Sequence, residues 1–177
     1  RSDLIARYNN GELMHADSIH FPDSLKYTTQ RLGRTVYGGG GIMPDYFVPI
    51  DTTTYTNVHR NLVAKGIVNK AAAVYIDQHR KEMQRKYKGF DAFNANYQVG
   101  QEVLGILRQE AEKQKVELKE DEYQRSLPLI CTQLKELMAR DLWDLCEYYE
   151  VINDTNESVK QAIRVLNNDY ERYLSVK

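Results

Sequence analysis

Four side chains that could do chemistry lie close together near the start of the sequence. The segment HADSIH carries His15, Asp17, Ser18 and His20, which are residue types found in metal sites and in hydrolase active sites. Proximity in the sequence is the only argument for such a site, because Asp and Ser beside Pro22 are ordinary turn formers. We therefore expect a turn-rich loop here.

A run of four glycines, Gly38, Gly39, Gly40 and Gly41, is a second candidate, since glycine-rich loops bind phosphates. Such loops end in Gly-Lys-Ser/Thr or open a helix. Here the sequence IMPDYFVPI follows, in which Pro44 favours extended backbone at the residue before it. We expect no phosphate site. The glycines are instead expected to permit positive φ angles or a close approach of two backbones in a sheet.

Two cysteines and two histidines lie in helical patterns. The pattern predicts one helix for Cys131 and Cys146, which separates them by roughly 22 Å, too far for a disulfide. We expect both to be buried thiols, and His59 and His79 to be packed or half-exposed side chains. No zinc-ligand spacing accompanies the cysteines, so neither a metal nor a cofactor is expected.

The elements that hold these residues change in character near residue 55. Before that point, a short helix is expected to end near Gly11, and residues 25–29 and 34–37 are expected to form a hairpin through Gly33. The sequence DYFVPI predicts a third strand that Pro49 ends.

After that point, apolar residues recur at spacings of three and four, which is typical of amphipathic helices. Helices are predicted at about 57–66, 69–87 and 99–115, with a helical turn between the last two. The longest helix is expected to begin at Ser126 and Pro128 and to continue through Tyr149. Trp143 lies off its apolar stripe and is expected to pack against a neighbouring helix or to contribute to an interface.

A last amphipathic helix is predicted after the sequence NDTNES, where Asp154 and Glu157 resemble a capping box. Its apolar stripe is expected to join the helical core and consists of Val159, Ala162, Ile163, Leu166, Tyr170, Tyr173 and Leu174. The fold class is therefore mainly α: a bundle of four or more helices preceded by a short β-hairpin segment. The boundary is placed at residues 51–57, between a segment 1–54 and a helical domain 55–177.

Composition limits the function. The 24 Lys and Arg residues against 25 Asp and Glu residues give a net charge of -1, which does not favour binding to nucleic acid. The basic segment RKEMQRKYK is expected to be a solvated helix end. No apolar run approaches the roughly 20 residues that span a bilayer, so no membrane segment is expected.

The segment GRTVYGGGGIMPDYFVP resembles part of the carboxyl-terminal processing (tail-specific) serine peptidases, which carries a Gly-x-Gly-Ile-x-Pro-Asp core followed by an apolar strand. Here that core is Gly39, Gly41, Ile42, Pro44 and Asp45. The segments ADSIHFPDSLKYTTQRLGR and LKELMARDLWDLCEYYEVINDTNESVKQAI look similar to the long C-terminal extension of the Bacteroidetes-type members. The resemblance covers most of the chain.

This resemblance implies a mixed α/β peptidase core joined to a PDZ domain, with a serine nucleophile and a lysine general base, in the periplasm or cell envelope. The family places both catalytic residues upstream of the glycine segment, and their usual sequence contexts do not occur here. No catalytic residue is therefore assigned, and the chain alone is expected to be inactive.

On this interpretation, residues 1–54 are the last strands and a loop of the peptidase core. Residues 55–177 support, regulate or dimerise the enzyme, and the partners are its polypeptide substrates and, if the helices dimerise it, a second copy of the chain. A different class of function stays open: a free-standing helical module that binds other proteins and has no catalytic activity.

Overall fold

The chain folds mainly into helices. The computed structural model describes residues 2–31, 33–38, 44, 46–51 and 53–171. Contacts divide the chain into two compact units, one made of Arg1–Asp51 together with Glu157–Lys177, and one made of Thr52–Asn156. Our sequence boundary lies at residues 51–57 and assigns all of 55–177 to one domain, whereas these contacts group the last helix with the first unit.

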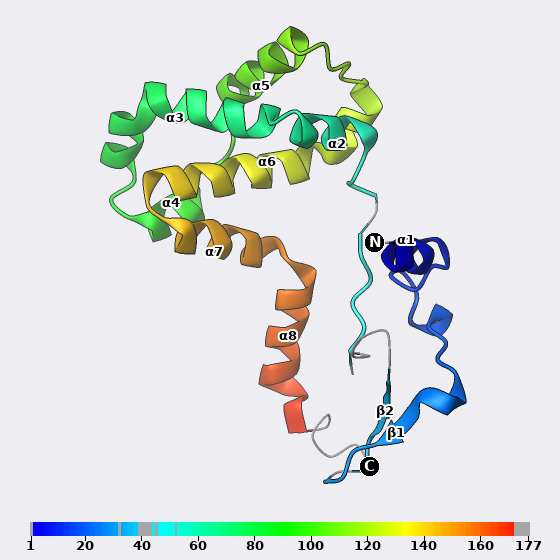
Figure 1. Ribbon diagram of the computed structural model, residues 1–177. Helices are drawn as coiled ribbons and strands as arrows, with labels where there is room; N and C mark the ends of the chain where they lie inside the picture. Colours follow the sequence, from blue (N-terminus) through cyan, green and yellow to red (C-terminus); the bar gives the residue numbers. More distant parts are fainter. Residues whose placement is uncertain (1, 32, 39–43, 45, 52, 172–177) are drawn as a thin grey trace. The chain divides into compact units, whose positions relative to one another are not determined.

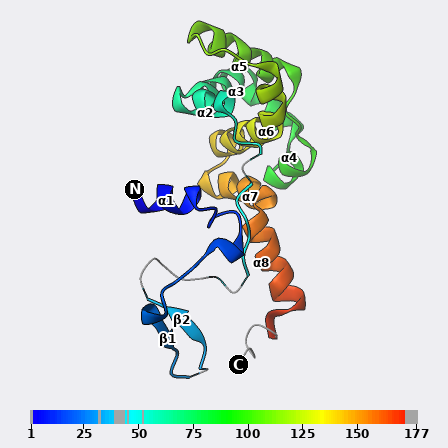
Figure 2. The same cartoon turned by 90° about the vertical axis from the view of Figure 1, so that its right-hand side faces the viewer.

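The unit Thr52–Asn156 is entirely helical where it has regular structure. Its α-helices are α2 (Asn57–Ala64), α3 (Ile67–Lys86), α4 (Phe90–Asn96), α5 (Gln101–Lys113), α6 (Glu120–Leu142) and α7 (Leu145–Thr155). α3 packs against both α5 and α6, α2 continues along α6, and α7 folds back onto α6 (Figures 1 and 2). The expected mainly α fold, with a helical bundle after a short hairpin, is confirmed.

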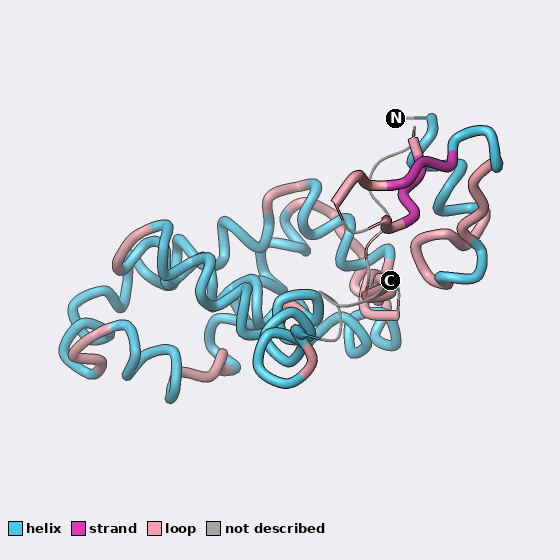
Figure 3. Tube along the Cα trace, turned by 90° about the horizontal axis from the view of Figure 1, so that it is seen from below, coloured by secondary structure: helices cyan, strands magenta, loops and turns pink. Residues whose placement is uncertain are grey.

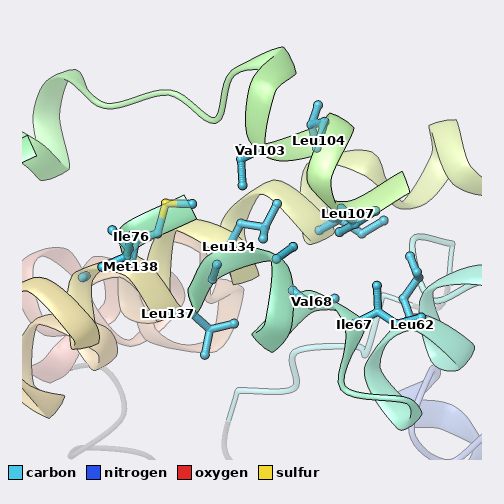
Figure 4. Close-up of a cluster of buried hydrophobic side chains, with 14 of the residues drawn as sticks. Leu62, Ile67, Val68, Ile76, Val103, Leu104, Leu107, Leu134, Leu137 and Met138 are labelled. Atoms are coloured by element: carbon cyan, nitrogen blue, oxygen red, sulfur yellow. The ribbon is translucent and has the colours of Figure 1, made fainter. Parts of the chain in front are cut away.

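The core of this unit consists of the apolar stripes of α3, α5 and α6. Figure 4 shows Val103, Leu104 and Leu107 of α5 beside Leu134 of α6, with α3 residues nearby. Leu107 and Leu134 are completely buried. Because each fully buried leucine stabilises a fold by about 1.5–3 kcal/mol relative to exposure, this layer holds the unit together.

An aromatic cluster closes one end of the unit. The ring of Phe93 in α4 stacks on Tyr97 at 4.8 Å, and Trp143 lies 5.2 Å from Phe93 and 5.8 Å from Phe90 between ring centroids. Tyr87, which follows α3, meets Phe93 edge-on. The expectation that Trp143 packs against a neighbouring helix is confirmed, and the neighbour is α4.

The start of α6 differs from our prediction. The helix begins at Glu120, and Pro128 lies inside it instead of in its first turn. Glu120, Asp121 and Glu122 occupy the first turn, where carboxylates stabilise the positive end of the helix dipole. The helix therefore starts six residues before the predicted start at Ser126, in a charged sequence.

The end of α6 also differs. The helix stops at Leu142, and Asp144 starts α7 by accepting a hydrogen bond from the Leu145 N–H at 2.6 Å. Our single helix through Tyr149 was therefore wrong. Cys131 lies half-buried in α6 and Cys146 lies exposed in α7, so the prediction of two buried thiols in one helix was also wrong.

Buried hydroxyl groups tie the start of α2 to α6. Thr56 caps α2 by accepting from the His59 N–H at 3.2 Å, and its Oγ1 lies 2.7 Å from Ser126 Oγ. Ser126 Oγ also donates to the Thr54 carbonyl at 2.7 Å. Ser126 was expected at a helix start, but it is a fully buried residue inside α6 that bridges two elements.

The other unit has little regular structure before its last helix. α1 (Ser2–Asn9) ends before Gly11, which has φ +78°, as expected. Strands β1 (Lys26–Thr28) and β2 (Thr35–Tyr37) pair antiparallel, with Tyr27 opposite Val36, and are the only magenta elements of the described chain in Figure 3. The hairpin is confirmed.

The third expected strand is not present. Residues 46–50 are described and form no strand, because no neighbouring strand pairs with them there. Ile50 instead donates one backbone hydrogen bond to the Leu13 carbonyl at 3.1 Å. The sequence YFVPI therefore has strand composition without strand pairing.

The last helix, α8 (Glu157–Asn168), also differs from our prediction, which placed its apolar stripe in the core. It has the expected apolar stripe, but none of its residues is buried. Ile163 is 53% exposed and Leu166 is 61% exposed. Apolar residues at helical spacing predict an amphipathic helix, but they do not predict which surface packs against its apolar side.

Candidate functional site

The glycine segment is described only at its edges. Gly38 donates its N–H to the Leu25 carbonyl at 2.7 Å, next to the hairpin. A Cβ at Gly38 would lie 2.9 Å from Cε2 of the Tyr27 ring, so the backbone and the ring approach closely there. Gly39, Gly40, Gly41, Ile42 and Asp45 lie outside the described residues, and Pro44 is exposed.

The HADSIH cluster does not assemble into a metal site. Asp17, Ser18 and His20 line an open, polar surface depression of about 540 Å³ together with Asn10 and Glu12. In the part of the chain that the structure describes, no group of three or more His, Cys, Asp or Glu residues could hold a metal ion. Residues 16–18 form a 3₁₀ turn, in line with the expected turn-rich loop.

Two other cavities have a more enclosed, more apolar lining. The unit that contains α8 holds a cavity of about 460 Å³ with a mostly apolar lining. Tyr46, Phe47 and Val48, the expected strand residues, line it together with Ala162 and Val165 of α8. Near it, Arg7 Nε donates to Glu12 Oε2 at 3.0 Å, so these two charges neutralise one another.

The cavity in the helical unit is the better candidate, because polar groups from three helices converge on it. It measures about 350 Å³ and is lined by α4, the segment after α4, the middle of α6 and the end of α7. The lining residues are Asn94, Tyr97, Gln98, Val99, Cys131, Thr132, Lys135, Val151, Asp154 and Thr155. We call it the α4–α6–α7 cavity.

A chain of polar contacts crosses this cavity. Lys135 Nζ in α6 donates to the Asn94 carbonyl at 2.6 Å, and the Asn94 side-chain amide donates to Asp154 Oδ2 in α7 at 2.7 Å. Burial lowers the pKa of Lys135, and the nearby carboxylate of Asp154 opposes that shift. Asn94 is therefore hydrogen-bonded both to the ammonium group of Lys135 and to the carboxylate of Asp154.

Two threonine hydroxyl groups complete the polar lining. Thr132 Oγ1 donates to the Pro128 carbonyl at 3.1 Å, and Thr155 Oγ1 donates to the Ile152 carbonyl at 2.9 Å. Both oxygens therefore keep lone pairs that can accept hydrogen bonds. Tyr97 is 8% exposed, and its buried hydroxyl lies near Tyr75.

The arrangement supports binding better than catalysis. The nearest nucleophile is Cys131, and burial raises the pKa of its thiol, which disfavours the reactive thiolate. Val99, Val151 and the thiol supply apolar surface between the charged groups. The cavity thus combines one cation, one anion, hydroxyl groups and an apolar floor, which is the composition of a small-ligand site.

The two histidines that the sequence singled out lie elsewhere in this unit. His59 is 5% exposed and pairs its Nε2 with Gln133 Oε1 at 3.0 Å. His79 stacks on Tyr75, with Nδ1 3.0 Å from the Tyr75 carbonyl and Nε2 3.2 Å from Glu102 Oε1. Both are packed or half-buried, as expected.

Sequence reasoning missed the α4–α6–α7 cavity. Asn94, Lys135 and Asp154 belong to three helices and lie far apart in the sequence, so no motif spacing could indicate them. Asp154 was expected to cap the last helix, but it lies inside α7 and accepts from Asn94. Helix packing, and not local sequence, creates this site.

Comparison with known proteins adds one finding. Residues 58–144 match a family of unknown function, DUF8443. No curated protein and no solved structure matches the chain. The matched segment begins in α2 and ends just after α6, so it takes in the helices that form the core of the helical unit and ends before α7.

Proposed function

We propose that this chain is the C-terminal portion of a tail-specific serine endopeptidase of the cell envelope, and that its helical unit supports or dimerises the enzyme without taking part in the chemistry. The single observation that carries the proposal is the glycine segment followed by Pro44, Asp45 and an apolar run, which resembles a specific segment of that family. Residues 58–144 match a family of unknown function, which assigns no role to the helical unit.

Two features of the structure support the proposal. β1 and β2 have three residues each and are largely exposed, and so small a hairpin is stable only when it continues a larger sheet or packs on other elements. A peptidase core that contributes the remaining strands provides such a sheet. The exposed stripe of α8 likewise requires a partner surface.

The second candidate is a helical module that binds other proteins and has no peptidase history. The exposed apolar residues of α8 favour it, because a binding helix presents such a face. The sequence encoded upstream of Arg1 separates the two candidates. The peptidase proposal requires a PDZ-like region and a serine and a lysine in catalytic contexts there, and the module requires neither.

The proposal is tested with an active-site serine probe. The 177-residue chain should not be labelled, because the proposal places the nucleophile and its base outside it, whereas the full gene product that contains it should be labelled once. Stoichiometric labelling of the 177-residue chain, lost when one of its serines is substituted, would contradict the proposal. Ser126→Ala is the matched control, since Ser126 is buried and bridges Thr56 and Thr54.

None of the helices that the structure describes has the length and apolar character needed to span a bilayer. The proposed place in the periplasm or cell envelope therefore rests on the family resemblance and not on the described helices. The proposed substrates, polypeptides cleaved by the parent enzyme, rest on the same resemblance.

A further inference from the structure

We infer that the α4–α6–α7 cavity binds a small zwitterion, an aliphatic α-amino acid. The ligand's carboxylate would bind at Lys135 and its ammonium at Asp154, while its side chain lies on Val99 and Val151. This inference does not depend on the proposed peptidase function, because every residue that carries it belongs to the helical unit.

The charged residues of the cavity indicate a ligand that carries both a negative and a positive group. Lys135 is the one cation and Asp154 the one anion among the residues that line the cavity. One ammonium hydrogen of Lys135 is used by the Asn94 carbonyl, so the other two can reach a ligand. A simple anion would meet the carboxylate of Asp154 and a simple cation would meet Lys135, whereas a zwitterion pairs with both.

The hydroxyl groups fit the same ligand. The Thr132 and Thr155 oxygens already donate to helix carbonyls, so each can accept from an ammonium N–H. Tyr97 contributes its ring to the lining, while its buried hydroxyl lies near Tyr75.

The apolar part of the cavity lining indicates an aliphatic side chain on the ligand. Val151 is 2% exposed, and Val99 and Cys131 are half-buried. An aliphatic group covers this surface without leaving a polar atom unpaired. A volume of about 350 Å³ holds an amino acid of leucine size.

The experiment titrates the 177-residue chain with three probes and follows backbone amide shifts by NMR. L-Leucine carries both charges, 4-methylpentanoate lacks the ammonium, and 3-methylbutylamine lacks the carboxylate. We expect saturable shifts at Val99, Thr132 and Thr155 with leucine, and affinities at least about tenfold weaker for each analogue.

The matched variants are Lys135→Met, which keeps the aliphatic stem beside Phe93, and Lys113→Met, which removes an exposed lysine paired with Glu110 on α5. Lys135→Met should weaken leucine binding at least about tenfold, and Lys113→Met should leave it unchanged. Asp154→Asn provides a second test if Lys135→Met disturbs the fold, which the amide spectrum reports directly. Asp154→Asn should also weaken leucine at least about tenfold.

Three results would overturn the inference. The first is the lack of any saturable shift with leucine at millimolar concentrations. The second is equal affinity for leucine and one of the analogues, because a single charge would then suffice. The third is leucine binding that neither Lys135→Met nor Asp154→Asn weakens, since the ligand would then lie elsewhere.

Discussion

Glu136 is a buried carboxyl whose pKa is strongly raised. It lies in α6, is 8% exposed, and burial raises its pKa to about 7, while a hydrogen bond with Tyr148 opposes that shift. In the unfolded chain the carboxyl ionises near 4.5. Between these two values the folded chain keeps a proton that the unfolded chain has lost, so the free energy of unfolding falls as pH rises.

We therefore expect Glu136→Gln to stabilise the chain at about pH 8 and to have little effect at about pH 5, because glutamine resembles the protonated acid. The difference should be on the order of 1 kcal/mol, since solvent screening at a partly accessible carboxyl reduces the effect. Urea unfolding at the two pH values measures it. Glu117→Gln, at an exposed position, is the control, and equal pH dependence in parent and Glu136→Gln would contradict the account.

Substitutions at two glycines with open surroundings test how backbone conformation alone affects the free energy of unfolding. Gly66 has φ +66° between α2 and α3, while Gly105 lies inside α5, and an added Cβ would meet no described atom within 4 Å at either. Gly66→Ala should destabilise by about 1–2 kcal/mol, because the left-handed conformation strains other residues. Gly105→Ala should stabilise by about 0.5–1 kcal/mol. Chemical denaturation measures both, and equal effects would contradict this reasoning.

At the scale of the element, Pro128 is a residue type that disfavours the helix in which it lies. It is exposed inside α6, where proline removes the hydrogen bond to the carbonyl four residues earlier and crowds that turn. We expect Pro128→Ala to raise the free energy of unfolding by about 1–3 kcal/mol, as measured by urea unfolding. Gln124→Ala, one turn earlier on the same helix, should change it much less.

A Pro128→Ala variant less stable than the parent would contradict this expectation. It would mean that proline at this position supports the packing of its half-buried neighbour Leu127 against the core. The amide spectrum of the variant would show shifts along α6 in that case.

Helix positions were predictable wherever packing and sequence agree. α3 and α5 lie within a few residues of their predicted bounds, because apolar residues such as Ile76 and Leu107 recur at helical spacing and face the core. The start of α6 was missed because its first turn is acidic and polar, so it has no apolar period to detect. The break after Leu142 was missed because the apolar pattern continues through Tyr149.

The candidate site could not be predicted for a different reason. Lys135 lies on α6 beside the apolar stripe and resembles any solvated lysine in the sequence. Its partner Asn94 lies on another helix, and only tertiary packing places that carbonyl 2.6 Å from Nζ. The hairpin at Gly33, in contrast, was predictable because its signal is local.

At the scale of the whole chain, the helical unit should fold by itself. Its core is formed by residues such as Leu62, Phe93 and Leu134, which all lie between Thr52 and Asn156. We expect a fragment of residues 52–156 to show a helical circular dichroism spectrum and a cooperative thermal transition close to that of the full chain. The fragment 1–51, with one short hairpin, should show no cooperative transition.

One result for these two fragments would contradict the prediction. If fragment 52–156 unfolds without cooperativity, then the strands or α8 are part of its core. Strands in the core would make the boundary at residues 51–57 wrong, whereas α8 in the core would agree with the predicted domain 55–177.

The central claim is that this chain is a non-catalytic portion of a tail-specific peptidase. Its most direct test is cleavage of an unstructured reporter polypeptide, followed by mass spectrometry, for the full gene product and for residues 1–177 alone. The account predicts cleavage by the full gene product and none by residues 1–177. Lack of peptidase activity in the full gene product, or cleavage by residues 1–177 alone, would contradict it.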